Sequence, residues 1–120
     1  RTKAHSTMSQ LARRINEDNL SIWMFPEGTR SRGRGLLPFK TGAFHAAISA
    51  GVPIIPVVCS TTHNKINLNR WDNGKVICEI MEPIDVSGYT KDNVRDLAAY
   101  CHDLMEKRIA ELDEEIAKGN

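Results

Sequence analysis

The stretch that decides the fold runs from residue 22 to residue 31 and reads Ile22-Trp23-Met24-Phe25-Pro26-Glu27-Gly28-Thr29-Arg30-Ser31. Its first four residues are apolar, which is typical of a short buried strand, and Pro26 ends that strand because proline donates no ladder hydrogen bond. The residues after Pro26 are polar and include glycine, as in the loops at the carboxyl edge of an open α/β sheet, where ligands bind. The stretch predicts a strand at residues 22–25 followed by a phosphate-recognition loop.

The sequence on either side of this stretch predicts more elements of an α/β domain. Apolar residues at helical spacing predict an amphipathic helix over about residues 4–17 and a compact helix over residues 41–50, which Gly51 ends. Residues 52–59 predict a strand. Strand, helix and strand in this order form a unit whose strands are parallel in nearly all proteins. We expect a mixed, mostly parallel sheet flanked by helices.

The second half of the chain predicts one more strand and a long helix. Alternation over residues 75–81 favours an exposed strand of antiparallel type, and the Asp-Asn-Gly sequence before it favours a turn. From Asp92 onward apolar residues recur at three and four positions, which predicts a long helix with one apolar face. Since no linker divides the chain, we expect residues 1–120 to belong to one domain.

Two motifs separated by the length of a helix carry a family resemblance. The first is residues 25–31 followed by Phe39-Lys40-Thr41-Gly42-Ala43, and the second is Val52-Pro53-Ile54-Ile55-Pro56-Val57. In this order they resemble the glycerophospholipid acyltransferase family over nearly the whole chain. The resemblance implies an incomplete glycerolipid acyltransferase-type domain. Because the chain starts at Arg1 rather than at Met, we expect residues 1–120 to be its carboxyl-terminal part.

The catalytic residues that the resemblance implies are absent from this sequence. The family carries a catalytic His and Asp in an upstream Asn-His-x-x-x-x-Asp motif, and none of the 4 histidines here has Asp five residues later. The residues found five positions after His5, His45, His63 and His102 are Gln10, Ala50, Leu68 and Lys107. We expect no catalytic residue in this chain and no acyl transfer by the chain alone.

The resemblance also implies a reaction and its partners. In the family a fatty acyl group passes from a thioester, acyl-CoA or acyl carrier protein, to the free hydroxyl of lysophosphatidate, which gives phosphatidate. The implied chemistry needs no metal and no bound organic cofactor. The implied location is the cytoplasmic face of the inner membrane, with this piece peripheral to the membrane surface.

Five residues are expected to bind the substrate. Arg30 is the leading phosphate contact because its guanidinium has forked donors and keeps its charge, although an ion pair with Glu27 is the alternative. Glu27 could bond a glycerol hydroxyl or fix loop amides. Gly28 and Thr29 suit a sharply turning backbone that offers amides to an anion, as many plain turns also do. Lys40 precedes the positive end of a helix, where it contacts phosphate or is simply solvated.

The surroundings of these residues are basic. Between Glu27 and Asp72 the sequence has no acidic residue, which favours an anionic ligand. The basic residues in that interval are Arg30, Arg32, Arg34, Lys40, Lys65 and Arg70. We expect Arg32 and Arg34 to be solvated and to steer anions. The apolar run at residues 36–39 suits contact with a bilayer or packing over the core.

Composition limits the remaining possibilities. A chain of 120 residues with 41% hydrophobic content can bury a core, and its longest comparable apolar stretch, residues 52–59, is too short to span a bilayer. The 3 cysteines are widely spaced among apolar residues, which predicts reduced, buried thiols rather than a metal site or a disulfide framework.

Two other classes of function stay open. One is a noncatalytic phosphate- or lipid-binding module, and the other is RNA binding through the Arg-Gly repeat at residues 32–35. RNA binding is disfavoured because only 6% of the chain is aromatic and because Trp23 and Phe25 are expected in a core strand, whereas single-strand binding surfaces need exposed aromatics.

Overall fold

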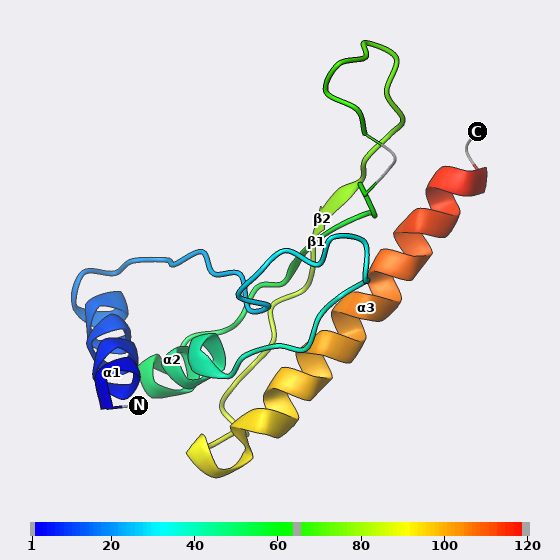
Figure 1. Ribbon diagram of the computed structural model, residues 1–120. Helices are drawn as coiled ribbons and strands as arrows, with labels where there is room; N and C mark the ends of the chain where they lie inside the picture. The colour runs from blue at the N-terminus through cyan, green and yellow to red at the C-terminus, as the bar shows by residue number, and fades with distance from the viewer. Residues whose placement is uncertain (1, 64–65, 119–120) are drawn as a thin grey trace.

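The computed structural model describes residues 2–63 and 66–118 (Figure 1). Its elements are α1 (Thr2–Glu17), α2 (Gly42–Ala50), β1 (Val57–Cys59), β2 (Cys78–Ile80), a 3₁₀ turn (Lys91–Asn93) and α3 (Val94–Lys118). Helices α1 and α2 lie side by side at one end, and α3 runs along the molecule past the two strands (Figure 1). The three predicted helices are confirmed.

Helix α2 is short because its sequence sets both limits. It follows Thr41, and it stops at Gly51, whose left-handed backbone (φ 68°) lets its N–H donate to the carbonyls of Ala47 and Ile48. At its first residue, a Cβ built on Gly42 would lie 3.6 Å from the sulfur of Met8. Met8 of α1 thus lies against the first turn of α2 at ordinary van der Waals distance.

The sheet differs from the expected one. Strands β1 and β2 pair antiparallel with Val58 opposite Glu79, and an isolated bridge between Ile54 and Ile84 extends the same ribbon. The antiparallel strand predicted over residues 75–81 is confirmed, although β2 is shorter. A mostly parallel sheet is not what the described residues form, since their sheet has two strands and both belong to this antiparallel ribbon.

The strand predicted at residues 22–25 is not formed, so that prediction is wrong. These residues have no regular secondary structure, and Trp23 and Phe25 are 67% and 78% exposed. Their two rings contact each other edge to face, with centroids 6.2 Å apart. A strand is stable only when a neighbouring strand satisfies its backbone groups, and none of the described residues supplies one here.

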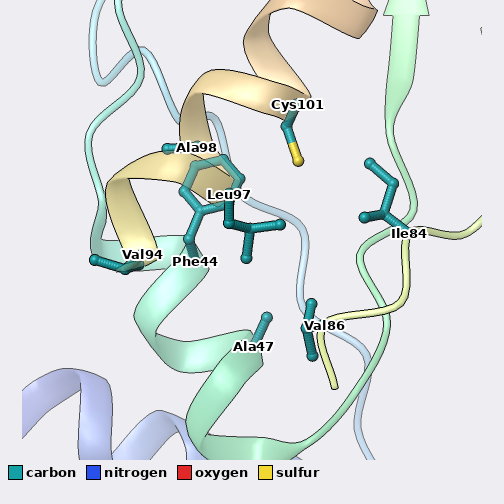
Figure 2. Packing of buried hydrophobic residues seen from close by; sticks show 8 residues of the cluster. All are labelled: Phe44, Ala47, Ile84, Val86, Val94, Leu97, Ala98 and Cys101. Carbon is teal, nitrogen blue, oxygen red and sulfur yellow. The ribbon is translucent and has the colours of Figure 1, made fainter. Parts of the chain in front are cut away.

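The core lies where α3 crosses α2 and the end of the strand ribbon. Leu97 is 0% exposed and Cys101 is also buried, and both face Phe44 of α2 (Figure 2). Ile84 and Val86, which follow β2, close the other side of the cluster (Figure 2). The apolar stripe predicted on the long helix is confirmed by these contacts.

The cysteines correct a second expectation. Strand pairing places Cys59 directly opposite Cys78 with their Cα atoms 4.0 Å apart, and the two form a disulfide on an exposed part of the sheet. The prediction of reduced, buried thiols is wrong for this pair because spacing in sequence did not reveal the strand register. It is confirmed for Cys101, a free and buried cysteine, and burial raises the pKa of its thiol to about 11.

Polar contacts fasten the sheet to α3. Arg108 binds Glu79 of β2 through two hydrogen bonds, Nε to Oε2 at 2.7 Å and Nη2 to Oε1 at 2.9 Å, and it also pairs with Glu111 at 2.8 Å. The hydrogen bonds from Arg108 lower the pKa of Glu79. Asp113 accepts hydrogen bonds from the backbone N–H and the hydroxyl of Thr61, at 2.8 and 2.6 Å. The hairpin is thus held along the outer half of α3.

Candidate anion-binding site

The loop from residue 26 to residue 40 is closed by two backbone hydrogen bonds. Gly28 N–H donates to the carbonyl of Phe25 at 3.1 Å, which makes a tight turn with Gly28 at φ +72°. Lys40 N–H donates to the carbonyl of Pro26 at 2.8 Å. Since the second bond joins residues 14 positions apart, it brings the base of the first turn next to Lys40, two residues before α2 begins.

The side chain of Lys40 lies against Gly28. A Cβ built on Gly28 would come within 2.8 Å of both Lys40 Cε and Lys40 Nζ. A side chain at residue 28 would displace the end of the Lys40 side chain, and the positive φ angle is the stronger reason for glycine at this position. The ammonium of Lys40 therefore lies beside Gly28, which is two residues before Arg30 in the chain.

Glu27 is used inside the loop. Its Oε2 accepts the backbone N–H of Leu37 at 2.9 Å in a partly buried position, which is the loop-fixing role considered from the sequence. Among the described residues Arg30 has no ion pair with Glu27, and Arg30 and Thr29 are both exposed. The carboxylate accepts a loop amide instead, and no acidic side chain of residues 2–63 and 66–118 forms an ion pair with Arg30.

The Arg-Gly repeat forms a second turn beyond Arg30. Arg32 has a left-handed backbone (φ 53°), and Arg34 donates from Nε to the carbonyl of Ser31 at 2.8 Å. Both guanidinium groups are on exposed residues, as expected. A Cβ built on Gly33 would lie 2.5 Å from Cδ2 of His63, so the repeat packs against the start of the loop between β1 and β2. Lys65, the other basic residue expected nearby, lies outside the described residues.

Sequence reasoning missed the contribution of α3 to this loop. His102 Nε2 lies 3.2 Å from the carbonyl of Leu36, and the His102 ring packs edge-on against Phe39 with centroids 4.9 Å apart. Phe39 in turn stacks on Phe44 of the core at 6.0 Å. Leu36, Leu37 and Phe39 are half-buried, so the apolar run packs over the core. The one sequence signal for this contact was that His102 directly follows Cys101, which was predicted to be buried.

The start of α2 completes the arrangement. Thr41 provides no side-chain cap, and the first turn of the helix carries no acidic side chain. The open amides of such a helix start and its positive dipole end attract anions. The start of α2 lies two residues after Lys40 in the same loop, with Arg30 exposed earlier in that loop.

The described residues show neither a group of metal ligands nor a membrane-spanning helix. Over residues 2–63 and 66–118, no three His, Cys, Asp or Glu side chains are grouped so that they could hold a metal ion. In the same part of the chain, no helix combines the length and the apolar character that crossing a bilayer requires.

Comparison with known sequences gives a consistent result. Residues 1–60 match the sequence model of the family described as Acyltransferase. A 1-acyl-sn-glycerol-3-phosphate acyltransferase of Haemophilus influenzae is 97% identical over 120 residues, which are 100% of this chain and 50% of that protein. The Escherichia coli protein of the same name is 68% identical over 118 residues, which are 98% of this chain and 48% of that protein. The chain spans about half the length of the curated relatives it matches.

A solved structure shares the fold. The crystal structure of the 1-acyl-sn-glycerophosphate acyltransferase from Thermotoga maritima superposes with a TM-score of 0.69 at 30% sequence identity. The match covers 88% of this chain and 43% of that protein. The elements described above therefore belong to an arrangement that also exists inside a longer protein.

Proposed function

This chain belongs to the acyltransferase family, and from that premise we propose that it supplies the phosphate-binding side of a 1-acyl-glycerol-3-phosphate acyltransferase. In the proposed reaction the free hydroxyl of lysophosphatidate attacks the carbonyl carbon of an acyl thioester on coenzyme A or acyl carrier protein. An ester C–O bond forms, the C–S bond breaks, and the hydroxyl proton ends on the released thiol. The product is phosphatidate.

The availability of Arg30 is the observation that carries the proposal. Glu27 is bonded to Leu37 rather than to Arg30, and the end of the Lys40 side chain lies beside Gly28. A guanidinium and an ammonium that belong to one loop favour a doubly charged phosphate monoester, and the guanidinium can bind two of its oxygens at once. In the proposed complex Arg30 orients the phosphate and Lys40 adds charge, while Glu27 keeps the loop in shape.

The catalytic residues and the membrane are proposed to come from outside this piece. The general base would be the His of the family motif, oriented by its Asp, and this sequence contains neither in that pattern. We place the reaction at the cytoplasmic face of the inner membrane, with this piece peripheral, because lysophosphatidate and phosphatidate are lipids.

The proposal extends to the sheet. Because the curated relatives are about twice as long, a strand from their other half could pair with residues 22–25 and bury Trp23 and Phe25 in a mostly parallel sheet. The exposed apolar run would then be the junction between the two halves. The backbone amides of residues 22–25 should therefore exchange hydrogen slowly in the longer protein and rapidly in this chain.

The experiment uses the Haemophilus influenzae relative as the donor of the other half. The 120-residue chain alone should not acylate lysophosphatidate above a buffer control, whereas a chimaera that carries this chain in place of the matching half should do so. Turnover by the isolated chain would contradict the division of roles. A folded chimaera without activity would favour the noncatalytic phosphate- or lipid-binding module instead.

RNA binding is an outcome to be measured in the same preparation. The exposure of Trp23 and Phe25 removes one of the two arguments against it. Titration of the isolated chain with a single-stranded RNA and with glycerol 3-phosphate separates the two classes of ligand. The proposal predicts that glycerol 3-phosphate competes with any RNA that binds at Arg30. RNA binding that persists in Arg30→Ala would be independent of this site.

A further inference from the structure

Leu68 and Trp71 are exposed in an unusual way. They are 94% and 103% exposed, and both lie on the loop of residues 60–77 that joins β1 to β2. A single exposed leucine is ordinary on a protein surface, but tryptophan is highly buried on average. Two large apolar side chains standing fully in water on one loop suggest a surface that contacts something apolar.

The turn that presents these side chains is fixed by polar groups. Asn73 Nδ2 donates to the carbonyls of Asn67 and Arg70 at 2.8 and 2.9 Å, and Asn73 Oδ1 accepts from Asn67 N–H at 2.7 Å. Arg70 N–H donates to the Asn67 carbonyl at 3.0 Å, and the Arg70 guanidinium pairs with Asp72. The side chains of Leu68 and Trp71 make none of the hydrogen bonds that order this turn. They can therefore leave water for an apolar environment without disrupting the turn.

The shape of the loop favours a bilayer over a rigid protein partner. Its described part extends beyond the strands and away from α1 and α2, as a convex projection (Figure 1). A narrow projection buries little area against a flat protein surface, whereas stable protein interfaces bury about 800 Å² per partner. The same projection can enter the interfacial layer of a membrane, where tryptophan keeps its N–H hydrated and buries its ring.

The charge around the loop favours an anionic surface. The described residues of this loop include Arg70 and Lys75 against one acidic residue, Asp72. Near its start, His63 packs on Gly33 between Arg32 and Arg34, so the basic repeat adjoins the loop. Anionic lipid headgroups attract such basic segments, and the attraction falls with salt.

We propose that Leu68 and Trp71 insert into the interface of an anionic bilayer and hold the chain at the membrane surface. This proposal rests on the proposed function. Insertion of Leu68 and Trp71 would hold the phosphate-binding loop beside the bilayer that contains its single-chain anionic lipid substrate. The hairpin loop anchors, whereas Arg30 and Lys40 bind the headgroup. These two roles are assigned to different residues and can be separated by mutation.

The test uses the 120-residue chain and vesicles of phosphatidylcholine with phosphatidylglycerol. In a Trp23→Phe background Trp71 is the one remaining tryptophan of the 2 in the sequence. Its emission should shift to shorter wavelength with these vesicles and should be quenched by brominated lipid. Leu68→Ser with Trp71→Ser, placed in the wild-type background, should lower vesicle partitioning by about tenfold or more. Trp23→Ser, which removes an exposed tryptophan elsewhere, should leave partitioning nearly unchanged.

The outcomes separate the anchor from the phosphate site. The double serine variant should lose vesicle partitioning and should still bind soluble glycerol 3-phosphate normally. An unchanged Trp71 emission, or equal partitioning of the double variant and the wild type, would overturn the anchor. An emission shift that grows with protein concentration in the absence of vesicles would also overturn it, because a second copy would then cover the tip.

Discussion

Two apolar regions of similar composition have opposite fates in this molecule. Phe44, Leu97 and Cys101 meet in a closed core, while Trp23 and Phe25 are exposed to water in the segment between α1 and α2. The core residues lie on helices, which satisfy their own backbone hydrogen bonds before they pack. The run at residues 22–25 has strand character, and a strand needs another strand for its backbone. Apolar composition alone thus does not determine burial.

The comparison also explains the position of the candidate site. The loop of residues 26–40 begins at the exposed run and ends on the core, where Phe39 packs between His102 and Phe44. One side of the loop is therefore fixed by α3, while its other side follows a segment that the described residues leave uncovered. Arg30 lies nearer the uncovered side.

The largest effect is expected at the centre of the core. Leu97→Ala removes a side chain that is 0% exposed and leaves a cavity among Phe44, Ala47 and Val86. The free energy of unfolding should fall by about 2–5 kcal/mol. Urea unfolding followed by circular dichroism measures this change. A loss below about 1 kcal/mol would mean that the α2–α3 packing is not the stable centre of the chain.

An intermediate effect is expected where the sheet meets α3, and it should depend on pH. Glu79→Gln removes the charged partner of Arg108 and should lower stability at pH 7 by less than Leu97→Ala does. The bonds to Arg108 lower the pKa of Glu79 in the folded state, so the stabilisation is complete above the unfolded pKa of about 4.3 and disappears as the pH falls through the folded value.

The measurement is urea unfolding of wild type and variant across that acid range. The difference between them should be largest near neutral pH and should vanish at the acid end. Glu82→Gln is the matched control, since Glu82 is an exposed neighbour on the same segment. A difference that stays constant with pH would contradict the ion pair.

The smallest effect on stability is expected in the exposed run. Trp23→Ser should change the free energy of unfolding of this chain by no more than about 0.5 kcal/mol, because the Trp23 side chain is 67% exposed. The same substitution in the chimaera should destabilise strongly if the other half covers residues 22–25. Equal effects in the two proteins would remove the proposed junction.

Patterns among neighbouring residues predicted the helices, whereas the features that the sequence predicted wrongly depend on long-range contacts. The periodicity of α3 and the glycine after α2 are properties of a few neighbouring residues, and both predictions are confirmed. The Cys59–Cys78 disulfide depends on a strand register, and the predicted strand at residues 22–25 depends on a missing neighbour. Neither dependence can be read from local sequence.

The candidate site shows the same division. The motif predicted Glu27, Gly28, Thr29, Arg30 and Lys40 as a group because they lie in or near one loop. It could not show that Lys40 would close over Gly28, that Glu27 would bind the amide of Leu37, or that His102 would reach the loop from 66 residues away. Those contacts required the fold.

The most direct test of the phosphate site is Arg30→Ala in the chimaera, measured as kcat/KM for lysophosphatidate. A charge-assisted hydrogen bond contributes about 1.5–3 kcal/mol, so the efficiency should fall by about 10- to 100-fold, mostly through apparent affinity. Arg30→Lys should recover part of the loss, because it keeps the charge without the fork. Arg13→Ala, which removes an exposed arginine of α1, is the control and should have little effect.

We expect this loss of efficiency with an unchanged thermal midpoint of unfolding in the Arg30→Ala chimaera, since Arg30 has no ion pair among the described residues. Unchanged affinity and turnover in folded Arg30→Ala chimaera would contradict the role of this loop in binding phosphate.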